Sequence, residues 1–348
     1  MDGLEIATSM KSQPLVSILI PAFNAEAWIA DTIRSALAQS WPHKEIIVVD
    51  DGSKDGTVRM ARRFEAAGVK VLTKANEGAA ATRNAAYTLS RGDYIQWLDA
   101  DDLLSPDKIA VQLAAREDAD DERVLLSSPW AYFAYRPERA RFVPNSLWHD
   151  LAPVDWLLRK MGENLHMQTA TWLTSRALAE AAGPWDTRML SDDDGEYYCR
   201  VLLASRGVRF VPEGGVFYRS VPSGRLSFVG TSGEKMDALL LSMKLHLQYL
   251  RSLETSPRVD KACLAYIQNW SAVFHPARED IFRELGAMAN ALGGMLEPQQ
   301  IRWKYAWIQP VFGRPAAWKA QLALPLQKAR VACAWDGVLH HYLGGHSR

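Results

Sequence analysis

Residues Tyr94–Asp102 read Tyr-Ile-Gln-Trp-Leu-Asp-Ala-Asp-Asp, a short apolar run that ends in three carboxylates. An apolar run of this length between turn signals is typical of a buried strand. In an open α/β sheet, ligands bind just beyond the carboxyl ends of the strands. The stretch therefore predicts that Asp99 and Asp101 lie where a substrate can reach them. On these residues alone, the alternative is a solvated acidic turn that caps the next helix.

Asp99 and Asp101 would repel each other unless a cation or protons lie between them. Divalent ions of the Mg²⁺ type are commonly held by one or two carboxylates together with phosphate oxygens. A divalent ion that also holds a diphosphate would remove the repulsion. We assign Asp102 to the turn before a further helix, which Ser105 is expected to cap with Pro106 at its first position.

The composition is that of a soluble globular protein with one large domain and an appendage. The chain has 348 residues, is 48% hydrophobic and 23% charged, and carries no net charge, which gives no signature of nucleic-acid binding. Its three cysteines lie far apart, as is usual in a reducing compartment. The polar N-terminus lacks the features of a signal peptide, and no run reaches the ~20 apolar residues of a membrane span. We therefore predict a cytoplasmic protein.

The first part of the chain alternates strand and helix patterns, which predicts a parallel sheet with right-handed crossovers. Strands are expected at Val16–Ile20, Ile46–Val49, Val69–Leu72 and Tyr94–Leu98, and helices at Ile29–Leu37, Thr57–Ala67 and Gly78–Leu89. Polar residues follow each strand. Because the carboxyl ends of parallel strands meet at one edge of a sheet, these residues should gather there.

The remainder of the chain is more mixed and then becomes helical. Strands are expected at Val124–Ser127 and Phe210–Val211, and helices at Leu178–Ala182, Glu196–Ala204, Asp237–Leu253 and Lys261–Phe274. This pattern predicts a tail over residues 1–14, an α/β domain over 15–225 with halves at 15–115 and 116–225, and a helical region over 226–348.

From Ile301 onward, seven Lys or Arg residues face a single acid, Asp336, and tryptophans are interleaved with them. This composition suits an interfacial helix on anionic lipid, and it equally suits a packed helical appendage with a solvated basic face. We favour peripheral contact with an anionic membrane. Pro310, Pro315 and Pro325 argue against one long amphipathic helix.

Five segments, in this order, resemble the signature motifs of family 2 of the glycosyltransferases, which have the GT-A fold. They are Val16–Asn24, Glu45–Ser53, Asn76–Asn84, Gly92–Asp101 and Gly183–Arg200. The fourth resembles the Asp-any-Asp metal motif of that family, and the fifth its acceptor-side block. The resemblance covers roughly Val16 to Arg219. It implies a GT-A domain, a Rossmann-like and mostly parallel sheet with helices on both faces, to which the helical C-terminal region is added.

The resemblance also implies a nucleotide-sugar donor, with a UDP-sugar favoured and GDP or dTDP possible. Pro21 and Phe23 would line the base pocket, and Asp51 would contact the base or ribose. Arg83 and Asp93 resemble positions near the nucleotide and its phosphates. For Arg83 the alternative is a structural salt bridge with one of the carboxylates. Asp50 is expected to be a turn-forming residue rather than a ligand contact.

For the chemistry, the resemblance implies that Asp99 and Asp101 hold Mn²⁺ or Mg²⁺. The family usually has Glu-Asp in the acceptor-side block and an Arg six residues after that Asp. Asp193-Asp194 occupies the pair and Arg200 keeps the spacing, although the preceding Asp192 leaves the register ambiguous by one. Asp194 is the candidate base and Asp193 the second choice. Attack opposite the leaving group would invert the anomeric centre.

Three other features have a purely structural interpretation as well as a functional one. Trp172 and His166 are expected to lie in the core rather than at the acceptor. Asp192 is expected to cap the helix that starts near Glu196. The segment 220–233, flanked by Arg219 and containing Arg225, either closes over the donor or is a plain linker.

The predicted function is thus a metal-dependent inverting glycosyltransferase that moves a sugar from a nucleotide-sugar to a hydroxyl group. The acceptor would be a saccharide or a lipid-linked molecule, in surface polysaccharide or glycolipid synthesis, at the inner face of the plasma membrane. The alternative is a catalytically silent nucleotide-sugar-binding or scaffold protein with the same fold. The intact pairs Asp99/Asp101 and Asp193/Asp194 argue against it.

Overall fold

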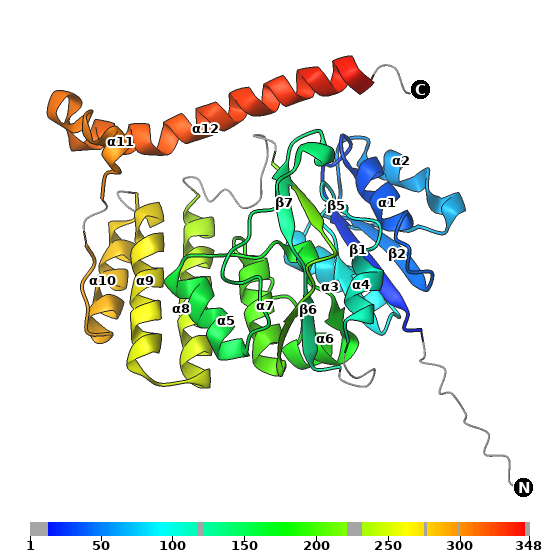
Figure 1. Cartoon of the computed structure of the whole chain (residues 1–348), viewed down its shortest axis with the longest axis horizontal. Helices are drawn as coiled ribbons and strands as arrows, with labels where there is room; N and C mark the ends of the chain where they lie inside the picture. The colour runs from blue at the N-terminus through cyan, green and yellow to red at the C-terminus, as the bar shows by residue number, and fades with distance from the viewer. Residues whose placement is uncertain (1–12, 117–121, 221–231, 275–276, 298–299, 345–348) are drawn as a thin grey trace, which may run out of the picture.

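The computed structural model describes residues 13–116, 122–220, 232–274, 277–297 and 300–344. Most of the predicted N-terminal tail, and the part of segment 220–233 that contains Arg225, lie outside these ranges. An α/β body carries a group of upright helices on one flank, and a long helix, α12, crosses above both (Figure 1). The predicted α/β architecture with a helical C-terminal region is confirmed.

The central sheet has five strands in the order β3-β2-β1-β4-β8. These are β1 (Val16–Ala22), β2 (Lys44–Asp50), β3 (Lys70–Thr73), β4 (Tyr94–Trp97) and β8 (Thr174–Ser175). The first four pair in parallel, and β8 runs antiparallel to β4. The sheet is therefore mostly parallel, as the alternating sequence pattern predicts.

Three helices connect the parallel strands: α1 (Ile29–Leu37), α2 (Thr57–Arg62) and α3 (Ala79–Leu89). The chain advances from β1 through β2 to β3 and then returns across β1 to β4. Because such crossovers are right-handed, the returning helix α3 covers the face opposite α1 and α2. The reversal lies between β1 and β4, and ligands of open α/β sheets bind at this kind of switch point.

The predicted helix over Thr57–Ala67 is divided. α2 ends at Arg62, and a short 3-10 turn, η1 (Glu65–Ala67), follows it. Gly68 ends the segment as expected, with a φ of 87° in the left-handed region that favours glycine.

Two small sheets extend the body on the side of β4. One has the order β5-β10-β7 and the other pairs β6 with β9. Their strands are β5 (Leu103–Leu104), β6 (Val124–Ser127), β7 (Trp130–Phe133), β9 (Gly207–Phe210) and β10 (Val216–Arg219). The sequence did not predict β5, β7 or β10, and it placed β9 three residues too late. These short strands depend on partners that are distant in the chain, so their local patterns are weak.

Ser105 does not cap the helix that follows it, which corrects the prediction. α4 (Lys108–Ala114) has Asp107 at its N-cap position, and the backbone N–H of Gly215 donates to Ser105 Oγ. β5 pairs with β10 just before this point, through Leu104 and Val216. The pairing of β5 with β10 draws the Ser105 side chain toward Gly215, just before β10, and away from α4.

The remaining helices surround the second half of the body and form the C-terminal region. They are α5 (Pro153–Gly162), α6 (Arg176–Ala182), α7 (Asp193–Ala204), α8 (Gly233–Leu253), α9 (Pro257–Phe274), α10 (Glu279–Ala291), α11 (Trp303–Ala306) and α12 (Gln309–Gly344), with 3-10 turns η2 (Pro137–Arg139) and η3 (Thr169–Thr171) between them. α8 packs on α7, and α9 packs on α5, so the helical region rests directly on the α/β body.

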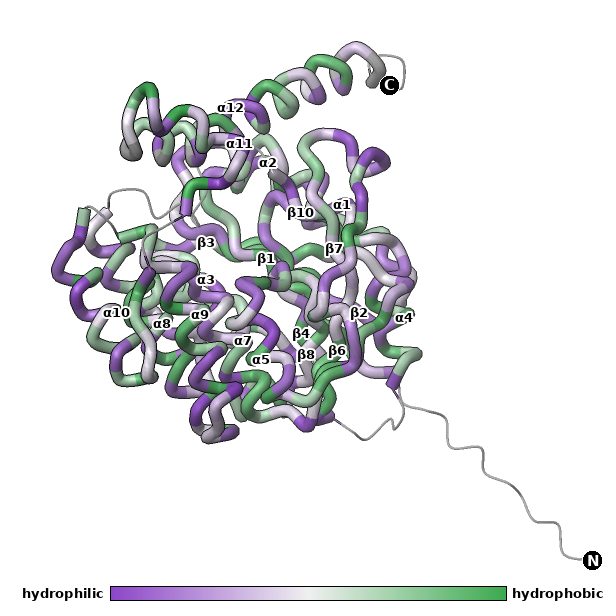
Figure 2. The backbone as a smooth tube through the Cα atoms, turned by 60° about the vertical axis from the view of Figure 1, so that its left-hand side comes forward, coloured by the Kyte–Doolittle hydropathy of each residue, from purple (hydrophilic) through white to green (hydrophobic). Residues whose placement is uncertain are grey.

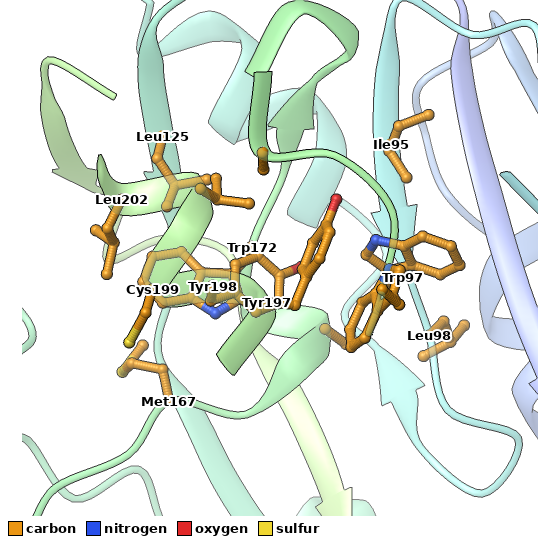
Figure 3. Packing of buried hydrophobic residues seen from close by; sticks show 14 of the residues in the cluster. Ile95, Trp97, Leu98, Leu125, Met167, Trp172, Tyr197, Tyr198, Cys199 and Leu202 are labelled. Carbon is orange, nitrogen blue, oxygen red and sulfur yellow. The ribbon is translucent and has the colours of Figure 1, made fainter. Parts of the chain in front are cut away.

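An aromatic core fixes α7 against the central sheet (Figure 3). Trp172 is 1% exposed and stacks on Tyr198 with 5.1 Å between ring centroids, so its core assignment is correct. Trp185 lies parallel to Tyr197 at 4.1 Å and meets Trp97 of β4 edge-on. Ring pairs of this kind contribute beyond the area they bury. The amino end of α7 is therefore held firmly in place.

α12 is one long element with a single break at Gly313, where φ is 81°. Pro310 and Pro315 fall in the first turns on either side of the break, where a missing N–H costs little. Pro325 lies in the interior of the part that follows the break, so this proline does not end the helix, while the break at Gly313 means that the stretch is not one uninterrupted helix. Along α12, polar and apolar residues alternate in short intervals (Figure 2). None of the helices in the described parts of the chain is long and apolar enough to cross a membrane.

A buried histidine between α8 and α9 gives a testable pH dependence. His246 is fully buried, its Nδ1 lies 2.7 Å from the Tyr266 hydroxyl, and burial lowers its pKa to about 3. The folded state therefore resists protonation, and its stability falls as pH drops below ~6.5 toward the folded value. Between pH 7 and pH 5, wild-type unfolding free energy should fall by about 2 kcal/mol more than that of His246→Asn. Urea titrations at pH 7 and pH 5 measure the unfolding free energy of both proteins. An equal decrease in the two proteins would contradict the prediction.

Candidate active site

The loops at the carboxyl ends of β1 and β2 are tied together. The backbone N–H of Asp51 donates to the Ala22 carbonyl, and that of Asn24 donates to Ser53 Oγ. Pro21 is half-buried at the end of β1, and Phe23 is 45% exposed just beyond it. An exposed phenylalanine on a tied loop can stack on a planar ligand. The structure thus brings Pro21, Phe23 and Asp51 to one edge of the sheet.

Asp51 organises the loop that leads into α3. Its carboxylate accepts from Lys74 Nζ at 2.6 Å and from the N–H groups of Glu77 at 3.0 Å and Gly78 at 2.9 Å. Burial alone would raise its pKa, but these donors lower it. Gly78 has a φ of 93°, which favours glycine there. Asp50 forms the expected turn by accepting from the Ser53 N–H.

Arg83 of α3 lies at the centre of the site. Its guanidinium donates to Asp99 Oδ1 at 2.9 Å and to Asp193 Oδ2, and it lies 4.5 Å from the ring centre of Trp185. Burial opposes its charge, but Asp193 and Asp99 outweigh burial and raise its pKa. Of the two predicted roles, the structure shows the salt bridge, and it involves two carboxylates rather than one. In the described residues, buried Arg83 Nε has no hydrogen-bond partner.

The three consecutive acids at the start of α7 have different environments. Asp192 occupies the N-cap position, but its side chain makes no capping bond and accepts instead from Ser242 Oγ of α8 at 2.6 Å. The predicted cap is therefore wrong, and the helix starts three residues earlier than expected. Asp193 is bound to Arg83. Burial, together with Asp194 and Asp99, outweighs Arg83 and raises the pKa of Asp193 to about 6.

Asp194, unlike its neighbour Asp193, makes no ion pair with Arg83 among the described contacts. Its Oδ2 accepts from Thr169 Oγ1 at 2.9 Å and its Oδ1 from the Gly195 N–H at 2.9 Å. These contacts orient the carboxylate without neutralising it. The sequence gives no signal for Thr169, because this residue reaches Asp194 only through the position of η3.

The acids that follow β4 also diverge. Asp102 is fully buried and accepts from Gln168 Nε2 at 2.6 Å and from the Arg219 N–H at 2.7 Å. Burial, and then Asp101 and Asp99, raise its pKa well above the ordinary value. Asp99 and Asp101 stay partly exposed. Asp102 therefore joins β4 to β10, while the other two acids face the site.

The carboxylates fit a divalent cation that brings further oxygen ligands. Asp99 and Asp101 supply hard oxygen donors, and the nearby Asp193 and Asp194 add negative charge that Arg83 only partly balances. In the residues that the structure describes, no three His, Cys, Asp or Glu side chains form a complete metal cluster. Two carboxylates together with the phosphates of a ligand are a common donor set for Mn²⁺ or Mg²⁺.

Asp93 lies apart from these residues, which corrects its predicted place near the nucleotide. It precedes β4 at the amino end of the sheet, and its Oδ2 accepts from the Leu15 N–H at 2.8 Å. The other predicted residues lie at the opposite, carboxyl edge. Strands extend over 3 Å per residue, so β4 and β1 separate Asp93 from a ligand there. Its contact fastens the start of β1.

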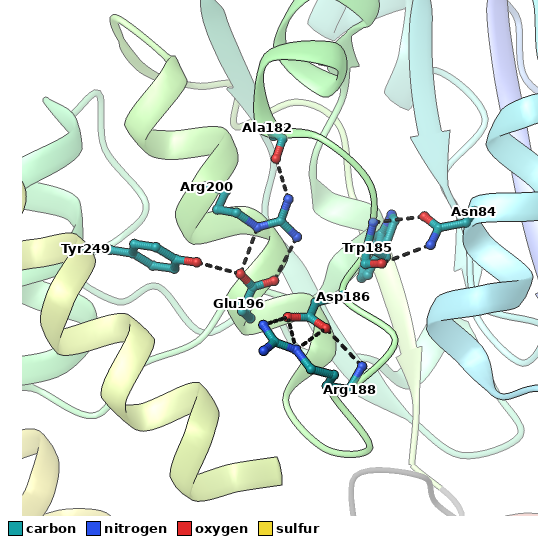
Figure 4. A network of polar contacts seen from close by, with 8 residues as sticks. All are labelled: Asn84, Ala182, Trp185, Asp186, Arg188, Glu196, Arg200 and Tyr249. Carbon is teal, nitrogen blue, oxygen red and sulfur yellow. Dashed lines mark hydrogen bonds and ion pairs between the residues drawn. The ribbon is translucent and has the colours of Figure 1, made fainter.

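A polar network holds α7 from the side away from the sheet (Figure 4). Arg200 donates to both Glu196 oxygens, at 2.7 and 2.8 Å, and to the Ala182 carbonyl. Tyr249 of α8 donates to the same Glu196 carboxylate at 2.8 Å. Arg200 thus keeps the expected spacing but acts as a positioning residue, through an ion pair that the sequence analysis did not identify.

His166 is exposed, so its assignment to the core is wrong. Its ring lies 4.9 Å from that of Trp130 on β7, and it lines a small cavity together with Asp194 and Trp172. The turn before η3 carries it toward the base candidate.

Comparison with known proteins agrees with this geometry. Residues 17–155 match the family model described as "Glycosyl transferase family 2". The matched residues run from β1 to α5. Over an aligned stretch of 104 residues, the chain is 42% identical to "Putative teichuronic acid biosynthesis glycosyltransferase TuaG" of Bacillus subtilis. This stretch is 29% of the chain and 41% of that relative. The chain spans between 16% and 60% of the lengths of the first curated relatives it matches.

Solved structures of GT-A glycosyltransferases share the fold. S. aureus TarS 1–349 in complex with UDP-GlcNAc matches 83% of this chain and 95% of its own, with a TM-score of 0.56 and 17% identity. The superposition with the mannosyltransferase PcManGT from Pyrobaculum calidifontis, in complex with GDP-Man and Mn²⁺, covers 93% of this chain and 85% of PcManGT. Its TM-score is 0.51 and the sequence identity is 18%. At these identities the likeness extends to the fold alone.

The buried Arg83 cluster should be sensitive to loss of its cation. Arg83→Met leaves Asp99 and Asp193 facing each other without compensation, which should lower the unfolding free energy by about 3 kcal/mol or more. Urea denaturation measures the change. Arg188→Met is the control, because Arg188 pairs with Asp186 in the same region but its side chain is 68% exposed, and exposed pairs contribute little. Equal stability of the two variants would contradict the central role of Arg83.

Proposed function

We propose that this protein transfers a sugar from a nucleotide-sugar donor to a hydroxyl group of an acceptor, with inversion and with the help of Mn²⁺ or Mg²⁺. The observation that carries the proposal is the double contact of Arg83. It joins Asp99, at the end of β4, to Asp193, at the start of α7. The metal motif and the base candidate thereby belong to one site at the switch point of the sheet.

The donor would bind across the carboxyl ends of β1 and β2. Pro21 and Phe23 would contact the base from one side, and the loop that Asp51 fixes would receive the ribose. A UDP-sugar is favoured, with GDP or dTDP as alternatives. The complexes of TarS with UDP-GlcNAc and of PcManGT with GDP-Man support a nucleotide-sugar on this fold.

Asp99 and Asp101 would hold the divalent ion against the diphosphate. Bound there, the ion would supply Lewis-acid stabilisation of the negative charge that grows on the departing nucleoside diphosphate. Arg83 adds a fixed positive charge within the same cluster, already paired and buried before any ligand arrives. Charge that is organised in advance costs no reorganisation during the reaction.

Asp194 would accept the proton of the attacking hydroxyl group. A carboxylate that remains ionised and correctly oriented can act as a general base. Thr169 and the Gly195 N–H orient Asp194, whereas Arg83 occupies one oxygen of Asp193. This difference supports Asp194 over Asp193 as the base. Attack from the side opposite the diphosphate would invert the anomeric centre, as in inverting glycosidases.

Two single substitutions, Asp101→Asn and Asp194→Asn, test these roles. The melting temperature of the wild type should rise with the nucleotides and nucleotide-sugars of one base, and part of this rise should require Mn²⁺. The reason is that a ligand that binds only the native state raises the melting temperature. Asp101→Asn should lose the metal-dependent part of the shift. Asp194→Asn should keep nucleotide affinity within a few fold and lose transfer, measured as nucleoside diphosphate release in the presence of acceptor.

Asp186→Asn is the matched control, because this acid lies near α7 but pairs with the exposed Arg188. It should retain both the shift and transfer. If Asp194→Asn still transferred the sugar and Asp193→Asn did not, Asp193 rather than Asp194 would be the base. A folded wild type with no shift in any series would favour the catalytically silent scaffold.

We further propose that the protein acts in the cytoplasm at the inner face of the membrane, in surface polysaccharide or glycolipid synthesis. The likeness to the relative named for teichuronic acid biosynthesis supports the polysaccharide role. α12 supports membrane contact. Its outer stripe, which we define as Leu324, Val331, Trp335, Val338 and Tyr342, is between 44% and 79% exposed. The spacing of these residues places them on one helix face.

The opposite face of α12 contacts the body. Asp336 accepts from Arg136 Nε at 2.7 Å and from the Tyr135 N–H at 3.0 Å, so the only acid after residue 300 is already paired. Lys328 lies beside the outer stripe. An apolar stripe with surrounding positive charge suits the surface of an anionic bilayer.

Flotation with liposomes tests this contact. The wild type should float with vesicles that contain phosphatidylglycerol and less with neutral vesicles, and Val331→Glu should reduce flotation because it places a charge in the stripe. Val143→Glu is the matched control, since Val143 is likewise 71% exposed but lies on the body. Absence of flotation in the wild type, with or without anionic lipid, would remove the membrane proposal.

A further inference from the structure

An exposed group of aromatic rings lies on the small sheet beside the site. β7 and β10 pair in parallel, with Tyr132 opposite Tyr218. Because side chains alternate along a strand, Trp130, Tyr132 and Tyr218 share one face. Tyr132 and Tyr218 stack with 5.3 Å between centroids, and Trp130 lies 4.9 Å from Tyr132 and 5.9 Å from Tyr218. We refer to these three residues as the aromatic platform.

The platform rises from the core to the surface, because Trp130 belongs to the core cluster and Tyr218 packs against it. Tyr132 is 48% exposed and Tyr218 half-buried, whereas Phe133 on the other face of the same sheet is 6% exposed. Trp130 is 9% exposed, and its Nε1–H has no hydrogen-bond acceptor within the described part of the chain. The accessible part of the platform is therefore formed by the rings of Tyr132 and Tyr218, on which a ligand could stack.

Contacts of neighbouring residues connect the platform to the base candidate and to the metal motif. On one side, the ring of His166 lies 4.9 Å from Trp130, and His166 and Asp194 line the same small cavity. On the other side, Arg219, which follows Tyr218, donates its N–H to Asp102 and its Nε to the Asp101 carbonyl, each at 2.7 Å. A molecule on the platform would thus be adjacent to both halves of the site.

We propose that the aromatic platform is the acceptor subsite and that it binds the terminal pyranose ring of a saccharide. The apolar C–H face of the ring would stack on Tyr132 and Tyr218. A hydroxyl of the ring would then point past His166 toward Asp194. Binding sites that combine aromatic walls with a few placed polar groups suit ligands that are apolar on one face and polar at the edge.

Charge favours a neutral sugar over a phosphate-bearing acceptor at this place. Asp193 and Asp194 lie at the start of α7, and Arg83 already binds one of them. A phosphate next to the reacting hydroxyl would face these carboxylates at short range. The inference rests on the proposed function, because it assigns the acceptor of the same reaction.

The test measures glycoside binding directly. Methyl glycosides of glucose, galactose, mannose and N-acetylglucosamine serve as probes, in the presence of UDP and Mn²⁺, and saturation-transfer NMR reports which ring protons contact the protein. Wild type should transfer saturation to one C–H face of at least one glycoside. Tyr132→Ala and Tyr218→Ala should each weaken its binding about tenfold, whereas Tyr132→Phe should retain binding because the ring remains.

Phe142→Ala is the control, since Phe142 is 39% exposed and contacts Phe217 on the opposite face of the sheet. It should bind glycosides as the wild type does. The UDP-dependent melting shift reports separately on the proposed function and should be unchanged in every platform variant. A UDP shift without binding of any glycoside, or saturation transfer to glycerol phosphate alone, would overturn the saccharide subsite and leave the donor site intact. Glycoside binding that Tyr132→Ala and Tyr218→Ala do not weaken would also overturn it.

Discussion

The site depends on one buried cation, Arg83, held between Asp99 and Asp193. The two carboxylates come from segments that are far apart in the chain, the end of β4 and the start of α7. Without Arg83 they would repel each other in a poorly solvated place. Because a buried charge is tolerated only when it is paired, each of the three residues requires the other two. This mutual requirement fixes the distance between the two halves of the site.

The surroundings make the Arg83 contact possible. The guanidinium lies over Trp185, whose ring stacks on Tyr197 and whose backbone exchanges two hydrogen bonds with Asn84. The arginine is therefore sandwiched between an aromatic face and its carboxylates, an arrangement that suits its planar and weakly hydrated group. Glu196, bound by Arg200 and Tyr249, holds the other side of α7. The helical C-terminal region thus contributes to the site through α8, although it donates no predicted site residue.

The same logic separates acids that are adjacent in the chain. Asp101 and Asp102 are neighbours, yet Asp102 is buried against Gln168 and Arg219 while Asp101 stays partly exposed. Asp193 and Asp194 are neighbours, yet Arg83 binds only the first of them. In each pair one carboxylate is bound to a distant part of the fold, and the proposed chemistry is assigned to the other. The proposed roles follow from this division.

Local patterns in the sequence were sufficient to predict the parallel strands β1 to β4, the helices between them, the resemblance to family 2 of the glycosyltransferases and the gathering of polar residues at one edge. These features follow from local hydrophobic periodicity and from the geometry of parallel sheets, which need no knowledge of distant contacts. Three other features follow from contacts between distant segments: Asp93 lies at the opposite edge, Ser105 binds Gly215 instead of capping α4, and Trp130, Tyr132 and Tyr218 share one face of the small sheet. Each of these depends on pairings such as β5 with β10 and β7 with β10, between segments about 85 to 115 residues apart. Their register is set by packing, because no local pattern specifies which distant strand a short segment will join.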